Sequence, residues 1–311
     1  MSDSEIVVGV DAGGSKTRVI VATALGETLA EVTGGGAAMT PGNADHCADV
    51  ITALVQSALE SAEQSGTTPR ALYAGVAGTG REAEQIALQD ALSRRELADD
   101  VAVETDAGIA LADAFGDRSG VLLIAGTGSI AFGRSPAGML ARCGGWGPTF
   151  GDEGSGTWIG RRALSVVAAA HDGREPETAL TGAILTAAQV NEVEQLIPWA
   201  IAADRDTLAA LAPSVLAMAM QDDVRANSIV DMAAEELLLH VRALAKRLFV
   251  DERAGFALAL TGGLLHRKSL LRKRLERRLR AAMPGATIHP DEVDGARGAV
   301  KLAMQIMTAR T

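Results

Sequence analysis

Two stretches of the chain open in the same way, and this shared layout limits the fold more than any other feature. Ile6–Val10 is a short β-branched run that ends in Asp11 and a glycine turn. Val121–Ala125 is an apolar run that ends in a second glycine turn. Further strand-like runs follow each turn, although the two halves share no sequence repeat of fixed period. The layout predicts two related α/β domains that face one another across a cleft.

Each half alternates strands with helices in a readable order. In the first half we expect strands over Ile6–Val10, Arg18–Ala22, Thr28–Thr33, Leu72–Ala77 and Val101–Glu104. We expect a helix beginning near Asp45, between the third and fourth strands, and further helices over Glu82–Leu92 and Ala107–Phe115 after the fourth and fifth strands. In the second half we expect three strands, a long helical region and one more strand, over Val121–Ala125, Ile130–Arg134, Met139–Cys143, Trp158–Val250 and Ala257–Leu260.

The chain has 311 residues, which suits two domains of roughly 100–200 residues each. We predict a first domain over residues 1–117 and a second over residues 118–293. The last segment, 294–311, has a helical pattern, and we expect it to pack back on the first domain.

Composition and charge indicate a folded protein that does not bind nucleic acid. Hydrophobic residues make up 48% of the chain and charged residues 22%, which is typical of a packed core. The formal net charge is −10, whereas binding to duplex nucleic acid depends largely on neutralising phosphates with cations. One basic run, Arg267 to Arg280, has a leucine at every fourth position, which predicts an amphipathic helix with a solvated cationic face. Attraction of an anionic ligand is the alternative function of that run.

The sequence also indicates the compartment. The N-terminus lacks the positive and long apolar regions of a signal peptide, and the apolar stretch Val121–Gly133 is too short to span a bilayer. The two cysteines, Cys47 and Cys143, match no zinc or redox spacing, so a disulfide framework is excluded. We therefore expect a cytoplasmic protein with reduced thiols and no membrane partner.

The first glycine turn is a candidate phosphate site. Glycines let backbone N–H groups approach a phosphate closely, and a carboxylate at a strand end such as Asp11 can hold Mg²⁺ through water. The turn is not a Walker A loop, because Ser15 rather than glycine precedes Lys16. A plain β-hairpin turn is the alternative interpretation.

The second glycine turn, Gly126 to Ser129, occupies the equivalent place in the second half. Two such turns, one in each half, suit a triphosphate that is held from both sides. Asp106 follows a hydrophobic strand and precedes a helix, where α/β proteins place catalytic groups. Its carboxylate would accept a proton from an attacking hydroxyl; alternatively, Thr105 or Asp106 only caps the helix.

The densest glycine region lies between Cys143 and Gly156. Trp146 stands among these glycines, where stacking on a sugar or base and burial in the core are the two interpretations. Asp152 and Glu153 follow, either as site residues or as first-turn acids favoured by a helix dipole.

Taken together, these motifs resemble the N-acetylglucosamine kinase and BadF/BadG ATPase group of the actin–hexokinase–Hsp70 superfamily. The matching pieces occur in the family's order and cover nearly the whole chain. They are GVDAGGSKT (9–17), PGNADH (41–46), ETDAG (104–108), LLIAGTGSIAFG (122–133), CGGWGPTFGDEGSG (143–156), LTGGLL (260–265) and DGARGA (294–299).

The resemblance implies two ribonuclease-H-like (actin-like ATPase) domains with an ATP and sugar cleft between them. It assigns Asp11 to Mg²⁺ and Asp106 to the catalytic base that accepts the proton of the sugar 6-hydroxyl. The implied ATP-binding residues are Gly13, Gly14, Ser15, Lys16, Gly126, Thr127, Gly128, Gly262 and Gly263. The implied sugar-binding residues, besides Asp106, are Asn43, Thr79, Ser129, Gly145, Trp146, Gly147 and Asp152.

The implied reaction is transfer of the γ-phosphoryl group of Mg·ATP to an amino sugar such as N-acetylglucosamine or glucosamine. Ile130 stands where the resembling kinases carry an asparagine that touches the sugar, so the identity of the sugar stays open. The implied partners are ATP and a small sugar, and the resemblance is compatible with a homodimer.

Two other functions fit parts of the same pattern. One is a BadF-type ATPase that activates a CoA-ester dehydratase, which would need an iron–sulfur cluster held by Cys47 and Cys143 of two subunits. The other is a non-catalytic sugar sensor.

Overall fold

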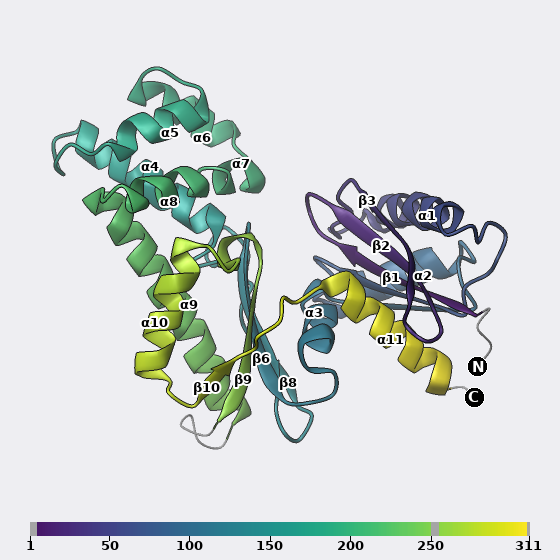
Figure 1. Ribbon diagram of the computed structural model, residues 1–311. Coiled ribbons are helices and arrows are strands. Elements are labelled where there is room, and N and C mark those ends of the chain that lie inside the picture. The colour runs from purple at the N-terminus through teal and green to yellow at the C-terminus, as the bar shows by residue number, and fades with distance from the viewer. Residues whose placement is uncertain (1–4, 250–254, 310–311) are drawn as a thin grey trace. The chain divides into compact units, whose positions relative to one another are not determined.

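The computed structural model describes residues 5–249 and 255–309 (Figure 1). These residues divide into two compact units. The chain passes from the first unit to the second between Asp117 and Arg118, and it returns to the first between Glu292 and Val293.

The first unit contains a five-stranded mixed sheet in the order β3-β2-β1-β4-β5. Its strands are β1 (Ile6–Ala12), β2 (Thr17–Thr23), β3 (Thr28–Gly34), β4 (Ala71–Val76) and β5 (Asp100–Glu104). The first three form an antiparallel meander, whereas β4 and β5 run parallel to β1. The helices are α1 (Ala44–Ser61), α2 (Glu82–Ser93), α3 (Asp106–Phe115) and α11 (Gly295–Ala309).

The central strand β1 has no polar side chain from Ile6 to Val10 because helices cover both of its faces. Val8 and Val10 pack with α1 and α2, while Val7 packs with α11. Alternate side chains of a strand point to opposite faces, so a strand buried on both sides reads as a continuous apolar run. Gly9 lets α11 approach closely, since a Cβ there would lie only 2.6 Å from the backbone nitrogen of Val300.

The second unit repeats the sheet plan with a larger helical region. Its sheet has the order β10-β9-β6-β7-β8. The strands are β6 (Gly120–Ala125), β7 (Ser129–Arg134), β8 (Leu140–Gly144), β9 (Phe256–Thr261) and β10 (Ala286–Ile288). The helices are α4 (Gly156–His171), α5 (Leu180–Ala188), α6 (Leu196–Ala202), α7 (Arg205–Ala209), α8 (Ala212–Met220), α9 (Val224–Leu248) and α10 (Leu270–Ala282), with 3₁₀ turns η1 (Val193–Gln195) and η2 (Gly263–Leu265).

The expected α/β fold is confirmed, and the structure adds that both sheets are mixed; the strand and helix order agrees closely with the expected one. The short strand β10 was not expected from the sequence. It has only three residues, none of them buried, so it lacks the apolar run that marks a strand.

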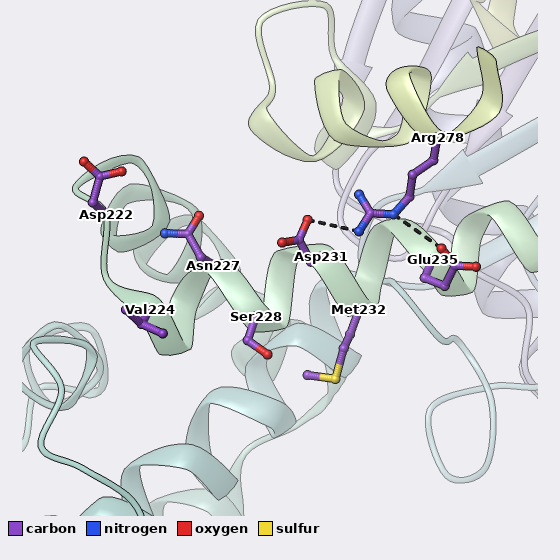
Figure 2. A pocket seen from close by; sticks show the side chains of 8 residues that line it. All are labelled: Asp222, Val224, Asn227, Ser228, Asp231, Met232, Glu235 and Arg278. Atoms are coloured by element: carbon purple, nitrogen blue, oxygen red, sulfur yellow. Dashed lines mark ion pairs between the residues drawn. The ribbon is translucent and has the colours of Figure 1, made fainter. Parts of the chain in front are cut away.

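The basic helix α10 differs from expectation because much of its cationic face is not simply solvated. Arg278 reaches Asp231 and Glu235 of α9 at 3.2 and 3.3 Å, as Figure 2 shows. Arg272 is buried and donates to the carbonyl of Leu265 at 2.9 Å. The hollow of about 580 Å³ beside Arg278 contains no residue that the sequence assigned to a site.

No helix in the described part of the chain is long and apolar enough to cross a membrane.

Candidate active site

Asp11 lies at the carboxyl end of β1, where the sequence predicted it. In the register of the sheet, Asp11 lies opposite Arg18 on β2 and opposite Gly75 on β4. Burial and, after it, the negative charge of Asp106 raise the pKa of Asp11 to about 6, although Arg18 acts in the opposite direction. The two carboxylates therefore lie within electrostatic reach of each other in the first unit.

The first glycine turn is a hairpin turn whose tip is open. Gly13 donates its N–H to the carbonyl of Lys16 at 2.9 Å, which closes the turn between β1 and β2. Gly14, Ser15 and Lys16 are exposed. Gly36 has no room for a side chain because a Cβ would overlap the carbonyl of Gly14. The hairpin geometry and an exposed phosphate cradle are compatible with each other.

Asp106 is the first residue of α3 and is half-buried. Capping of the helix falls to Thr105, whose side chain accepts the N–H of Gly108 at 2.9 Å. The carboxylate of Asp106 accepts the N–H of Ala107 at 2.9 Å. Thr105 is therefore the N-cap of α3, as one of the two alternatives from the sequence proposed, and the role of Asp106 as a base stays a prediction.

Asn43 and Thr79 lie in loops of the same unit. The Oδ1 atom of Asn43 accepts the N–H of Thr40 at 2.8 Å, and its Nδ2 atom donates to the carbonyl of Ala38 at 3.1 Å. The buried Oγ1 atom of Thr79 lies 2.7 Å from the carbonyl oxygen of Val76 and 3.0 Å from that of Glu104. Both side chains thus fix the backbone of loops next to the strand ends.

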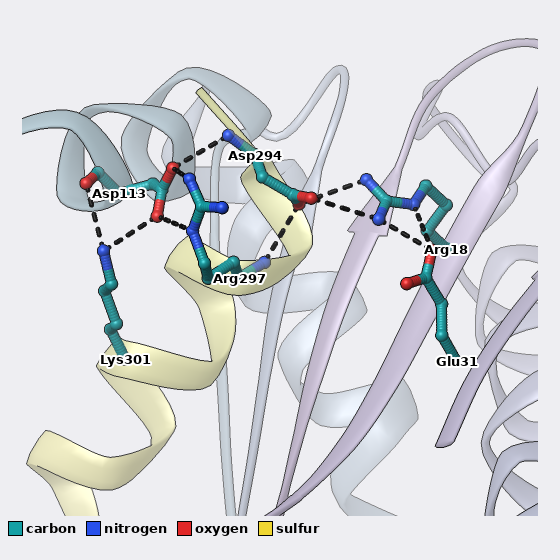
Figure 3. Close-up of polar contacts among 6 residues, drawn as sticks. All are labelled: Arg18, Glu31, Asp113, Asp294, Arg297 and Lys301. Atoms are coloured by element: carbon teal, nitrogen blue, oxygen red, sulfur yellow. Dashed lines mark hydrogen bonds and ion pairs between the residues drawn. The ribbon is translucent and has the colours of Figure 1, made fainter. Parts of the chain in front are cut away.

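A charged cluster joins α3, α11 and the β2–β3 hairpin (Figure 3). Asp113 accepts Arg297 at 2.7 and 2.6 Å and Lys301 at 2.8 Å. Asp294 accepts both terminal nitrogens of Arg18 at 3.1 Å. The cluster anchors the start of α11 in the first unit and places Asp294 near Asp11, whose pKa it raises.

In the second unit, the Gly126–Ser129 turn is fastened to the N-terminus of α4. Gly156 donates its N–H to the carbonyl of Gly126 at 2.8 Å, and Thr157 donates its N–H to the carbonyl of Thr127 at 3.2 Å. The carbonyls of the turn are thereby held by the helix, which fixes the backbone that would carry phosphate-binding N–H groups.

Gly262 and Gly263 follow β9, which runs parallel to β6 and ends beside it. Gly262 adopts φ +99° and a Cβ there would overlap the carbonyl of Ala125. The Cβ position of Gly126 lies 3.8 Å from the backbone nitrogen of Gly263. The structure therefore brings Gly126 and Gly263, two of the predicted ATP-binding glycines, close together.

The loop that carries Trp146 follows β8. Trp146 is 59% exposed, and Arg142 lies over its ring at 4.5 Å from the centroid. Burial of Trp146 in the core, the alternative from the sequence, is wrong. Gly145 and Gly147 on either side adopt positive φ angles, and a Cβ on Gly145 would lie 2.8 Å from the Cδ1 atom of Ile130.

Asp152 lies in this loop rather than in a helix. It adopts φ +58°, and α4 begins only after the cap residue Ser155. The interpretation of Asp152 and Glu153 as first-turn acids is therefore wrong. Burial raises the pKa of Asp152, an effect that Arg205 opposes. The buried hydroxyl of Ser129 donates to the carbonyl of Glu153 at 2.7 Å and ties the loop to β7.

Comparisons with known proteins now identify the family. Residues 8–303 match the model of the BadF/BadG/BcrA/BcrD ATPase family. The chain belongs to this family. It is 31% identical over 299 residues to the N-acetylmuramic acid/N-acetylglucosamine kinase of Clostridium acetobutylicum, covering 96% of this chain and 97% of that protein.

Two further similar proteins match nearly the whole length of this chain. The N-acetyl-D-glucosamine kinase of Dictyostelium discoideum is 29% identical, over 96% of this chain and 98% of that protein. A solved structure of a candidate N-acetylglucosamine kinase from Chromobacterium violaceum superposes with a TM-score of 0.81 at 27% identity, covering 97% and 100% of the two chains.

Within this family chain, the site residues expected from the sequence fall into two groups. Asp11, Asn43, Thr79 and Asp106 belong to the first unit, together with the turn from Gly13 to Lys16. The second group belongs to the second unit and consists of Gly126, Thr127, Gly128, Ser129, Gly145, Trp146, Gly147, Asp152, Gly262 and Gly263.

Sequence reasoning missed three polar residues next to these groups: Asp294, Arg205 and His240. Asp294 lies in the DGARGA motif, and that motif was the signal that could have identified it. Arg205 and His240 carry no local signal, because each is an ordinary polar residue in a helix. The Nε2 atom of His240 lies 3.6 Å from an oxygen of Glu153, which belongs to the glycine loop.

The residues at Asp11 suit a magnesium ion that also binds a phosphate. Among the described residues, no cluster of three acidic, histidine or cysteine side chains is arranged to hold a metal alone. Mg²⁺ usually keeps several waters and takes one or two carboxylates together with substrate phosphates. The partly buried carboxylate of Asp11, close to an exposed glycine turn, fits that kind of site.

Proposed function

We propose that this chain is an ATP-dependent amino-sugar kinase that transfers the γ-phosphoryl group of ATP to the 6-hydroxyl of its sugar. One observation carries the proposal. Asp11 and Asp106 lie within electrostatic reach at the carboxyl ends of parallel strands, in a chain that is similar over nearly its whole length to two sugar kinases. A carboxylate pair of this kind supports activation of a hydroxyl beside a metal–phosphate group.

In the proposed reaction, Asp106 accepts the proton of the sugar hydroxyl. The hydroxyl oxygen forms a bond to the γ-phosphorus while the bond from that phosphorus to the β–γ bridging oxygen breaks, and ADP leaves. Asp11 would hold Mg²⁺ through water, and the ion would neutralise charge on the phosphates. The glycine turns, Gly13–Lys16 and Gly126–Gly128, supply backbone N–H groups to the phosphates.

The relatives support an amino sugar as the acceptor, and the candidates are N-acetylglucosamine, N-acetylmuramic acid and glucosamine. Trp146 is exposed in the glycine loop, which favours a stacking contact with a sugar ring. Ile130 places an aliphatic side chain against Gly145 and adds apolar surface to that loop. We infer that apolar contact, rather than hydrogen bonding, contributes at Ile130.

An iron–sulfur ATPase activator fits the structure less well. Cys47 is fully buried in the first unit, where its thiol donates to the carbonyl of Ala38 at 3.2 Å and burial raises its pKa. A cluster shared by two subunits needs cysteines at the surface where the subunits meet. Cys47 is fully buried and does not meet this condition.

The proposal is tested by ADP release from Mg·ATP in a panel of sugars that contains N-acetylglucosamine, glucosamine, N-acetylmuramic acid, N-acetylmannosamine and glucose. We expect strong stimulation by at least one amino sugar and little by glucose. Sugar-independent hydrolysis of ATP would favour the ATPase activator. Sugar binding without ADP release would favour a sensor, and either result would overturn the proposal.

A further inference from the structure

A buried carboxylate oxygen near the second glycine turn lacks a hydrogen-bond partner. The side chain of Asp152 is 5% exposed, and its Oδ2 atom has no partner among the described residues. A buried oxygen without a partner costs folding stability, so such an atom in a polar loop requires an explanation. Binding of a ligand is one of the explanations that chemistry offers.

Arg205 lies beside this orphaned oxygen but does not satisfy it. Its Nη2 atom is 3.9 Å from Oδ2 of Asp152, which exceeds hydrogen-bond distance. The side chain is about half exposed, so its charge faces solvent on one side. The guanidinium group is therefore open to an additional acceptor, such as an anionic oxygen, on its exposed side.

Gly128 connects this pair with the phosphate turn. A Cβ on Gly128 would overlap the Nη2 atom of Arg205 and would lie 2.9 Å from Oδ2 of Asp152. The guanidinium group thus occupies space directly over the turn, which only glycine leaves free. The turn, the cation and the carboxylate converge on one point within the second unit.

Buried backbone contacts hold Arg205 over the turn. The Oγ1 atom of Thr157 is buried and lies 2.8 Å from the carbonyl oxygen of Thr127 and 3.1 Å from that of Arg205. Gly160 of α4 allows close packing against α7, because a Cβ there would overlap the carbonyl of Leu208. The start of α7 is therefore fixed to the same helix that fixes the glycine turn.

We propose that Arg205 binds the γ-phosphoryl group of ATP from the side of Gly128 and stabilises it during transfer. A guanidinium group is planar, permanently charged and matched to phosphoryl oxygens. Charge spreads over the equatorial oxygens during phosphoryl transfer, so a fixed cation at that place lowers the barrier. The inference rests on the proposed function, because it takes the turn as the phosphate cradle.

The alternative role for Arg205 is to neutralise Asp152 and nothing more. The two roles predict different losses. A γ-phosphoryl contact affects a triphosphate and spares a diphosphate, whereas a structural partner of Asp152 affects the loop and its sugar contacts.

The test compares Arg205→Met and Arg205→Lys with the wild type and with the control Arg174→Met, which removes an exposed arginine paired with Asp172 in the same unit. Calorimetry without sugar measures the affinity for Mg·ADP and for the imido analogue of Mg·ATP. For Arg205→Met we expect about a tenfold loss or more for the triphosphate analogue, less than a twofold change for ADP, and about a hundredfold loss of kcat. Arg205→Lys should recover part of each loss, and the control should match the wild type.

Equal losses for the diphosphate and the triphosphate analogue would overturn the proposal, and so would a loss confined to sugar affinity. The nucleotide comparison needs no sugar turnover. If the wild type fails in the sugar panel but Arg205→Met loses affinity for the triphosphate analogue and not for ADP, then the proposed acceptor is wrong and the phosphate contact stands.

Discussion

Asp106 and Asp11 show how one residue's chemistry depends on its neighbours. The pKa of Asp11 rises to about 6 through burial and then through the charge of Asp106. An additional cation near Asp11, besides Arg18 and Lys16, would lower that pKa again, since it stabilises the ionised form.

Replacing Asp106 by asparagine should remove the proton acceptor and keep the shape of the site. We expect kcat to fall by about 10²–10⁴-fold, the usual contribution of a general base, with the affinity for Mg·ATP nearly unchanged. Steady-state kinetics and calorimetry measure the two quantities. Asp90→Asn on the exposed face of α2 is the matched control. Near-wild-type turnover of Asp106→Asn would rule out its role as the base.

At the scale of secondary-structure elements, the Asp113 cluster connects two helices that the sequence separates widely. Asp113 lies on α3, and its partners Arg297 and Lys301 lie on α11. Burial alone would raise the pKa of Asp113, but hydrogen bonds from Arg297 and Lys301 outweigh burial, and the net pKa is lowered from 3.8. A depressed folded-state pKa means that the ionised side chain contributes stability above the unfolded-state pKa.

Asp113→Asn should therefore destabilise the protein by about 2–4 kcal/mol near neutral pH, because it leaves Arg297 and Lys301 without their carboxylate. The difference from the wild type should shrink as the pH falls below about 4, because the carboxylate of the unfolded wild type takes up a proton there and that of the folded protein only at lower pH. Urea unfolding at several pH values measures it. Asp99→Asn, which breaks an exposed ion pair with Arg70, should cost far less. A difference that is constant with pH would contradict the electrostatic explanation.

At the scale of the whole molecule, the negative net charge and the pairing of arginines with acidic residues both reduce the free positive charge that the protein presents. The chain carries a formal charge of −10. In the basic helix α10, Arg272, Arg274 and Arg278 form ion pairs with acidic residues of the second unit. Arg274 and Arg278 both reach Asp231 at 3.2 Å. The cationic run therefore presents less free charge than its sequence suggests.

We expect no measurable binding to a short DNA duplex even at low ionic strength, because phosphate neutralisation needs several free cations on one face. Fluorescence anisotropy of a labelled duplex at about 50 mM salt measures it, with a basic DNA-binding domain as positive control. Salt-sensitive micromolar binding would show that α10 offers a cationic surface after all.

The sequence by itself determined the elements, because strand and helix patterns depend on residues close in the chain. It located β1, β6 and the glycine turns that end them, and its motifs identified the family. Only the tertiary structure decided which distant side chains meet. Arg205 reaches Gly128 and Asp152 through the packing of α7 on α4, and Asp113 meets Lys301 across 188 positions of sequence. Such contacts depend on how whole elements pack, and no local pattern encodes that packing.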